Sequence, residues 1–233
     1  MKIIDLRNDV RQTLLQYFDR NLTNEDQVYD IGCGSKPFAS ALDGKLKKYI
    51  GVDVEDGFYD SSHIDLIGTA YDVPIDDRSA DAVISSQVLE HLEYPERAIK
   101  ETARILKKEG FFFLALPFMY PLHAEPHDYS RITEFKIKKM LETAGFEILE
   151  FQYIGGFWYL SGLFLGMYLQ PIDRGFLKKT KISTAFLWLI RLLFNVLHNL
   201  EGFTLRTFKK NPEIFRKKWI SNYVLVAKKT ETD

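Results

Sequence analysis

The sequence predicts an α/β protein built around a mostly parallel sheet. An apolar run, 28–31, carries a carboxylate at Asp30 and leads directly into a loop with two glycines. About twenty residues later a second apolar run, 49–52, ends in Asp53. A glycine loop after one strand and an acid closing the next are typical of a half-sheet that binds adenosine, with the acid on the ribose hydroxyls. The third glycine of the dinucleotide pattern is replaced by Lys36-Pro37, so no pyrophosphate ligand is expected.

The remaining elements follow from the spacing of apolar and turn-forming residues. Strands are expected over 27–31, 48–53, 64–68, 82–85, 111–116, 146–151 and 222–227, and helices over 5–20, 38–42, 95–108 and 134–143. Pro95 suits a first helical turn, and Gly110 is expected to cap the same helix at its end. Thr133 is expected to cap the last of these helices, which should stop at Gly145.

Composition and charge limit the function classes. The 233 residues fit one α/β domain with an elaboration. The single cysteine, Cys33, excludes an internal disulfide, and the N-terminus lacks the apolar core of a secretory signal, so a cytoplasmic location is expected. Residues 1–172 hold 18 basic and 27 acidic residues, whereas residues 173–229 hold 13 basic and three acidic ones. This split indicates an anionic partner for the C-terminal part, or else a solvated basic face.

Four motifs in order carry a family resemblance. Asp30-Ile31-Gly32-Cys33-Gly34 resembles the first motif of class I S-adenosylmethionine-dependent methyltransferases, in particular the type 11-like group. Segments 72–75, 79–83 and 88–92 resemble later landmarks of that family, and the match covers roughly residues 25–150. The resemblance implies a Rossmann-like three-layer sandwich whose seven-stranded, mostly parallel sheet ends in an antiparallel strand. It also implies S-adenosylmethionine as the cofactor.

The same resemblance implies a set of cofactor-binding residues. They are Asp30, Gly32, Cys33, Gly34, Asp53, Val54, Thr69, Ala70, Asp72 and Gln87. Asp30 and the loop amides would hold the methionine end, and Asp53 the ribose, unless these acids only cap nearby amides at their strand ends. Many relatives have an acid at the position of Thr69, so backbone amides or Asp72 would contact adenine instead. Cys33 is interpreted as a small packing residue.

The polar loop 118–131 is expected to reach the methyl acceptor. His127 is the first candidate for a general base because this loop would overhang the cofactor edge. His91, in a Glu-His pair that resembles the family's, is the second candidate, although this histidine is often structural in the family. His123 and Tyr129 are expected at the substrate.

Two further roles in this loop have alternatives. Arg131 is expected to pair an anionic substrate, or else Asp128. A metal site from His123, His127 and Asp128 is conceivable, but Pro126 breaks helical spacing there, so no metal is expected.

The function implied is transfer of a methyl group to an oxygen, nitrogen or carbon of a small or lipid-linked acceptor. The alternative is a non-catalytic, cofactor-binding partner protein that docks through its C-terminal part. An aminopropyl transferase on the same fold is less favoured, because no acidic run suited to a polyamine is present.

The family's last strand normally follows the sixth almost at once, whereas its candidate here lies about seventy residues later, as judged from strand patterning. Residues 155–220 are therefore predicted to be a helical, apolar and basic insertion within a single domain, 1–233. Its apolar stretches, 157–169 and 184–200, are not clean membrane spans, and the second carries Arg191.

Two roles for this insertion remain open. One is a substrate lid or a homodimer interface. The other is an interfacial helix that binds the anionic inner face of a membrane beside Lys178, Lys179, Lys181 and the basic residues of 209–218. Nucleic acid is not expected as a partner, because no binding module for it is recognised.

Overall fold

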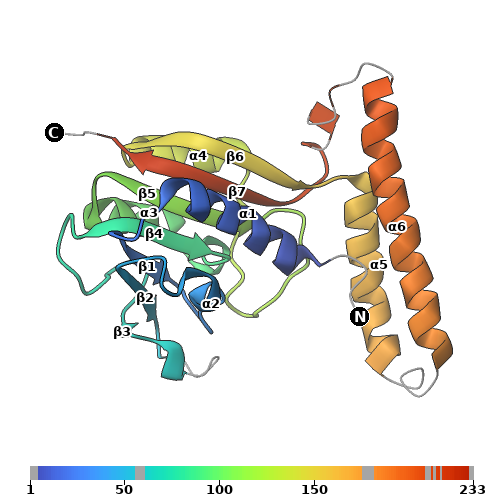
Figure 1. The fold of residues 1–233 in the computed structure, drawn as a ribbon, viewed down its shortest axis with the longest axis horizontal. Coiled ribbons are helices and arrows are strands. Elements are labelled where there is room, and N and C mark those ends of the chain that lie inside the picture. Colours follow the sequence, from blue (N-terminus) through green and yellow to red (C-terminus); the bar gives the residue numbers. More distant parts are fainter. Residues whose placement is uncertain are drawn as a thin grey trace. The chain divides into compact units, whose positions relative to one another are not determined.

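A computed structural model gives the fold of the chain (Figure 1). It describes residues 5–55, 61–174, 181–207, 211, 214–215 and 217–230. The chain folds as two compact units, one formed by 1–10 with 153–222 and the other by 11–152 with 223–233. The larger unit contains the glycine loop and the polar loop 118–131, so the candidate site lies within it.

One seven-stranded sheet has the order β3-β2-β1-β4-β5-β7-β6. Its strands are β1 (Gln27–Ile31), β2 (Lys48–Asp53), β3 (Leu66–Ile67), β4 (Ala80–Ser86), β5 (Leu106–Pro117), β6 (Phe146–Gly155) and β7 (Ile220–Lys229). The pairs β1–β2, β1–β4, β2–β3 and β4–β5 are parallel, and β7 runs antiparallel. The predicted fold class is thereby confirmed.

Helices cover both faces of this sheet. They are α1 (Leu6–Asn21), α2 (Ala39–Leu42), α3 (Pro95–Ile105) and α4 (Glu134–Thr143), with the short turns η1 (Ser61–His63) and η2 (Leu89–His91). Phe113 of β5 meets Phe18 of α1 at 4.9 Å between ring centroids, and Phe18 meets Phe38, next to α2, at 5.3 Å. Its neighbour Phe112 points to the other face, where it lies 5.5 Å from Phe146. Buried aromatic residues of β5 thus join the sheet to α1 on one face and pack against β6 on the other.

The predicted end of α3 and its glycine cap were wrong, whereas the two caps predicted for α4 were confirmed. The helix α3 ends at Ile105 rather than 108, because Leu106 is already extended (φ −70°, ψ 138°) and fully buried in the sheet. Gly110 therefore lies inside β5 instead of capping the helix, and a Cβ there would come within 3.0 Å of the Asp81 carbonyl oxygen. Thr133 does cap α4 by accepting a hydrogen bond from the Lys136 amide at 3.3 Å, and Gly145 follows with φ +81°.

The smaller unit contains a pair of helices, α5 (Phe157–Arg174) and α6 (Lys181–Thr207). They pack through aromatic contacts, with 6.4 Å between the ring centroids of Trp158 and Phe194 and 5.8 Å between those of Tyr159 and His198. Within the described residues, neither helix nor any other combines the length and the hydrophobicity needed to cross a bilayer. Of the basic residues predicted to face a membrane, Lys178, Lys179 and several of 209–218 lie outside the described residues.

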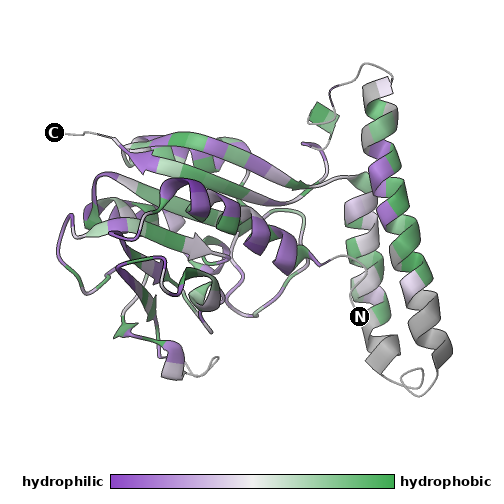
Figure 2. Cartoon of the chain, in the orientation of Figure 1, coloured by the Kyte–Doolittle hydropathy of each residue, from purple (hydrophilic) through white to green (hydrophobic). Residues whose placement is uncertain are grey.

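The helix α6 exposes a row of large apolar side chains. Figure 2 colours much of this helix green, which marks hydrophobic residues. The exposed residues are Trp188, Leu189, Leu192, Leu193, Val196, Leu200 and Phe203. Five of them, 189, 193, 196, 200 and 203, recur at alternating steps of four and three residues, the spacing of a coiled-coil seam. The residues that contact α5 lie on another side of α6, so this row forms a second apolar face of the helix.

Candidate active site

The carboxyl ends of the parallel strands meet at one edge of the sheet, and the candidate site is formed there. Ligands of open α/β sheets bind at this edge. The strand β1 leads there into the glycine loop, β2 ends at Asp53, and β4 leads into Gln87 and η2. The sheet therefore brings together residues that are more than fifty positions apart in the sequence.

Asp30 is buried in the centre of the sheet. It pairs in register with Gly51 of β2 and Ile84 of β4, and its side chain accepts a hydrogen bond from the Tyr49 hydroxyl. Burial raises the pKa of this carboxyl to about 7, an effect that the Tyr49 hydrogen bond only partly offsets. Asp30 therefore gains or loses its proton near neutral pH, and a cation bound beside it would favour the ionised form.

The glycine loop is held by hydrogen bonds to β2. The amides of Gly32 and Cys33 donate to the Val52 carbonyl at 2.8 and 3.3 Å, and the Gly34 amide donates to Asp53 Oδ2 at 2.7 Å. These amides are engaged within the protein, whereas the sequence predicted them to face the cofactor. Gly32 has φ +71°, and a Cβ there would lie 2.4 Å from Val88 Cγ2. The first glycine thus allows the segment after β4 to pack against the loop.

Asp53 and its neighbours form the outer part of this edge. Its Oδ1 accepts a hydrogen bond from the Val54 amide at 2.8 Å, so the carboxylate bridges the two loops. Two apolar side chains lie exposed at the ends of neighbouring strands: Val54 is 38% and Ile67 is 64% exposed. Cys33 is buried, and burial raises its pKa to about 12, which agrees with a packing role for the thiol.

The predicted adenine contacts lie just beyond β3. Thr69 and Asp72 form an isolated antiparallel bridge around Ala70, in which the Asp72 amide donates to the Thr69 carbonyl at 3.2 Å. At the end of β4, Gln87 adopts φ +61°, and its amide donates to the Ala115 carbonyl of β5 at 2.8 Å. A left-handed conformation is uncommon for glutamine and occurs most often at turns and sites.

The loop 118–131 is attached to η2 by backbone hydrogen bonds. The amides of Tyr129 and Ser130 donate to the Glu90 carbonyl at 2.8 and 3.3 Å, and His91 Nδ1 lies 2.6 Å from the His127 carbonyl oxygen. The loop that follows β5 is thus positioned by the turn that follows β4. Burial of His91 lowers its pKa, with a partial offset from the hydrogen bond to His127.

Arg131 is an internal clamp of this loop. Its guanidinium donates to both oxygens of Asp128, at 2.5 and 2.8 Å, and to the carbonyls of Tyr120 and Pro121 at 3.2 and 3.0 Å. These hydrogen bonds hold the pKa of Asp128 well below its usual range. The geometry favours the alternative in which Arg131 pairs Asp128 and shapes the loop.

The histidines of the loop occupy different environments. His127 is exposed, and its Nδ1 lies 3.3 Å from the Tyr129 hydroxyl. His123 instead faces His91, with 4.9 Å between their ring centroids. The ligand set considered from the sequence, His123 with His127 and Asp128, is not the one the fold assembles, because Asp128 is held by Arg131.

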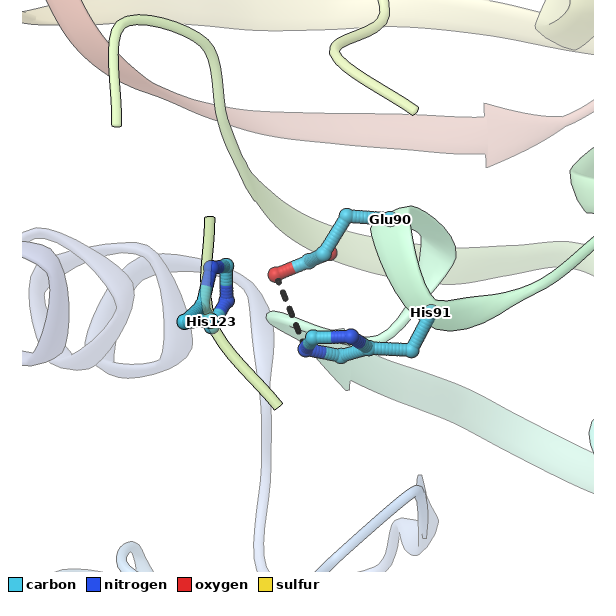
Figure 3. A group of neighbouring side chains, drawn as sticks. All are labelled: Glu90, His91 and His123. Atoms are coloured by element: carbon cyan, nitrogen blue, oxygen red, sulfur yellow. Dashed lines mark ion pairs between the residues drawn. The ribbon is translucent and has the colours of Figure 1, made fainter. Parts of the chain in front are cut away.

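Two functional candidates were missed by sequence reasoning. Glu90 lies in η2 with its side chain only 1% exposed, and its Oε1 is 3.8 Å from His91 Nε2 (Figure 3). Its signal in the sequence is a carboxylate next to His91 in the segment 88–92, whose other three residues are apolar. Tyr49 is the second, and nothing in its spacing indicated the hydrogen bond to Asp30.

Comparisons with known proteins agree with this arrangement. Residues 29–114 match the family model of a methyltransferase domain. These residues belong to a class I S-adenosylmethionine-dependent methyltransferase domain. Over 143 residues the chain is 27% identical to a probable S-adenosylmethionine-dependent methyltransferase of Mycolicibacterium smegmatis, covering 52% of each chain. It spans about half or less of the length of the curated relatives it matches.

Solved structures support the fold of this methyltransferase domain. An S-adenosylmethionine-dependent methyltransferase from Archaeoglobus fulgidus superposes with a TM-score of 0.54 at 16% identity, covering 95% of this chain and 94% of that one. A [4+2]-cyclase superposes with a TM-score of 0.58 at 17% identity, covering 94% of this chain and 82% of that one. At such identities the likeness concerns the fold alone. The family implies S-adenosylmethionine as the cofactor.

Proposed function

We propose that this protein is an active methyltransferase that transfers the methyl group of S-adenosylmethionine to a small or lipid-linked acceptor. The observation that carries the proposal is the packing of Val88 against Gly32. This contact joins the glycine loop to the segment that holds Glu90 and His91. A cofactor loop and a cluster of proton-binding side chains are thereby next to each other at one edge of the sheet.

The residues at this edge fit S-adenosylmethionine. A ribose diol needs acceptors, and Asp53 offers a carboxylate at the strand end whose oxygens have lone pairs left beside the bonds from Gly34 and Val54. The exposed side chains of Val54 and Ile67 offer apolar surface for the faces of an adenine ring. Asp30 offers a buried anion for the ammonium of the methionine end.

When bound, S-adenosylmethionine supplies a methyl group on a positively charged sulfur, which an acceptor attacks directly. The protein therefore needs to align the acceptor and receive its proton where it has one. His127 is the proposed base: it is exposed on the loop that follows β5, and its Nδ1 is oriented by the Tyr129 hydroxyl. The Arg131–Asp128 clamp holds the loop that carries both residues.

The test is incubation with cofactor labelled in its methyl group and a fractionated cell extract. Label is expected in a small-molecule or lipid fraction, and less of it when Asp53→Ala protein is used at a cofactor concentration that does not saturate the variant. Label in protein or RNA would contradict the proposed acceptor class. Label in no fraction, from protein that still binds S-adenosylhomocysteine, would favour the alternative below.

The alternative is a non-catalytic partner protein that binds the cofactor and docks through its helical unit. The exposed apolar row on α6, for example Leu193 and Leu200, favours it, since scattered exposure does not produce one continuous helix face. The same row suits a lipid-linked acceptor. The labelling experiment separates the two, because only an enzyme incorporates label.

A further inference from the structure

We propose that Glu90, His91 and His123 form a binding site for a divalent transition-metal ion, such as Zn²⁺. Each of the three offers one ligand atom, and these atoms lie within 4.8 Å of one another. Figure 3 shows the three side chains converging, Glu90 and His91 from η2 and His123 from the loop after β5. Two imidazoles and one carboxylate are a common ligand set for zinc and for non-haem iron.

The Glu90 carboxylate is the first argument. Its side chain is 1% exposed, and neither oxygen has a hydrogen-bond partner among the described residues. The nearby guanidinium of Arg131 is already engaged by both oxygens of Asp128 and by backbone carbonyls. A buried carboxyl is costly to ionise unless a cation compensates its charge, and a metal ion would do so.

The tautomers of the two histidines are the second argument. His91 Nδ1 lies 2.6 Å from the His127 carbonyl oxygen, and a carbonyl only accepts, so the proton is on Nδ1 and the lone pair is on Nε2. That Nε2 is the atom facing Glu90, at 3.8 Å. Histidines that bind metals usually donate their other N–H to a carbonyl or carboxylate in this manner.

His123 repeats the pattern. Its Nδ1 is 3.1 Å from the Pro121 carbonyl oxygen and 3.4 Å from Asp128 Oδ2. Arg131 Nη2 is also 3.4 Å from this nitrogen, but it already donates to Pro121 and Asp128 at 3.0 and 2.8 Å. Two acceptors at Nδ1 place its proton there and leave Nε2 with a free lone pair.

The distances require only a small adjustment. Ligand atoms of a tetrahedral zinc site lie about 3.4 Å apart, given bonds of about 2.1 Å. The Glu90–His91 pair at 3.8 Å is close to this value, and the ligand atom of His123, which lies within 4.8 Å of the other two, would have to move inward. A three-ligand site leaves a position open for water or for an oxygen of an acceptor.

The experiment measures metal binding to the full chain without cofactor, so its outcome does not depend on the proposed function. Protein stripped with a chelator is titrated with Zn²⁺ by calorimetry, and Co²⁺ is used to record the visible absorption of a coordinated ion. About one ion per chain is expected. Glu90→Gln and His123→Asn should each weaken binding by at least about 100-fold, more than the roughly 10- to 100-fold typical of outer-shell changes.

Two histidine variants serve as matched controls. His127→Asn keeps the backbone carbonyl that orients His91, and His63→Asn changes an exposed histidine in η1, so both should leave zinc affinity unchanged. Circular dichroism checks that each variant folds. If Glu90→Gln does not fold, the zinc affinity of His123→Asn alone tests the proposal. Equal losses in the control variants, or no zinc binding at micromolar concentrations by folded wild-type protein, would overturn the proposal.

Discussion

Cofactor binding should depend on pH through Asp30. Burial raises the pKa of this carboxyl to about 7 in the protein without ligand, so the carboxyl is largely protonated below that value. An ammonium group bound beside it favours the ionised form, and binding must then release a proton. Affinity should therefore fall as pH is lowered through 7.

The magnitude follows from the fraction of Asp30 that is ionised. With a pKa of about 7, roughly a tenth of the molecules are ionised at pH 6 and about three quarters at pH 7.5. Calorimetric titration with S-adenosylhomocysteine should thus show about eightfold weaker binding at pH 6. Titrations in two buffers of different ionisation enthalpy should show proton release at pH 6 and little at pH 7.5.

Tyr49→Phe provides a matched variant. The Tyr49 hydroxyl donates to Asp30 and favours the ionised form. A hydrogen bond to a charged group contributes about 1.5–3 kcal/mol, which corresponds to about one to two pKa units. The midpoint of the pH dependence should move upward by that amount, and Asp30→Asn should abolish the dependence. Equal affinity at pH 6 and 7.5 in the wild type, or a downward shift in Tyr49→Phe, would refute the reasoning.

Three further predictions concern other parts of the chain. Asp53→Ala removes a charge-assisted acceptor for the ribose, so S-adenosylhomocysteine should bind at least about tenfold more weakly in a calorimetric titration of folded protein. Unchanged affinity would place the ribose elsewhere. His127→Asn should lower turnover of the labelled acceptor by roughly 10²–10⁴-fold at nearly constant cofactor affinity, whereas full activity would exclude it as the base. The helical unit should bind anionic vesicles at low salt, and reversing Lys178, Lys179 and Lys181 to Glu should weaken this, because each basic residue contributes about 1 kcal/mol at such a surface. No co-sedimentation by protein that still binds cofactor would favour a lid or a dimer interface.

The first two strands were predictable because they are short apolar runs with clear ends. The ranges 27–31 and 48–53 were predicted with the bounds that β1 and β2 have. The end of α3 was not predictable from local signals: Leu106 continues the helical pattern, but its burial in the sheet makes it extended. Tertiary packing outweighed local propensity at that boundary.

The cofactor side of the candidate site could be predicted from the sequence, whereas the acceptor side could not. The cofactor side lies at strand ends, so Asp30 and Asp53 could be located by counting along the chain. The acceptor side depends on how loop 118–131 folds, which spacing does not determine. Spacing grouped His123 with His127, whereas the hydrogen bond from His91 to the His127 backbone turns the loop so that His123 faces Glu90.

The helical unit is the part of the chain that the methyltransferase fold does not account for. Periodicity predicted apolar helices there, but it could not show that a second apolar face of α6 is exposed beside the one that packs on α5. The residues of this row are all apolar, and burying apolar surface away from water is favourable. The row is therefore expected to be covered by a membrane or by another protein surface. A bilayer surface and a second copy of α6 would cover it differently: the first responds to salt and lipid charge, and the second to protein concentration. Trp188 lies on this row and is 54% exposed. In a variant whose other two tryptophans, Trp158 and Trp219, are replaced by Phe, a fluorescence change with vesicles indicates a bilayer surface, and one with protein concentration indicates a second copy of α6.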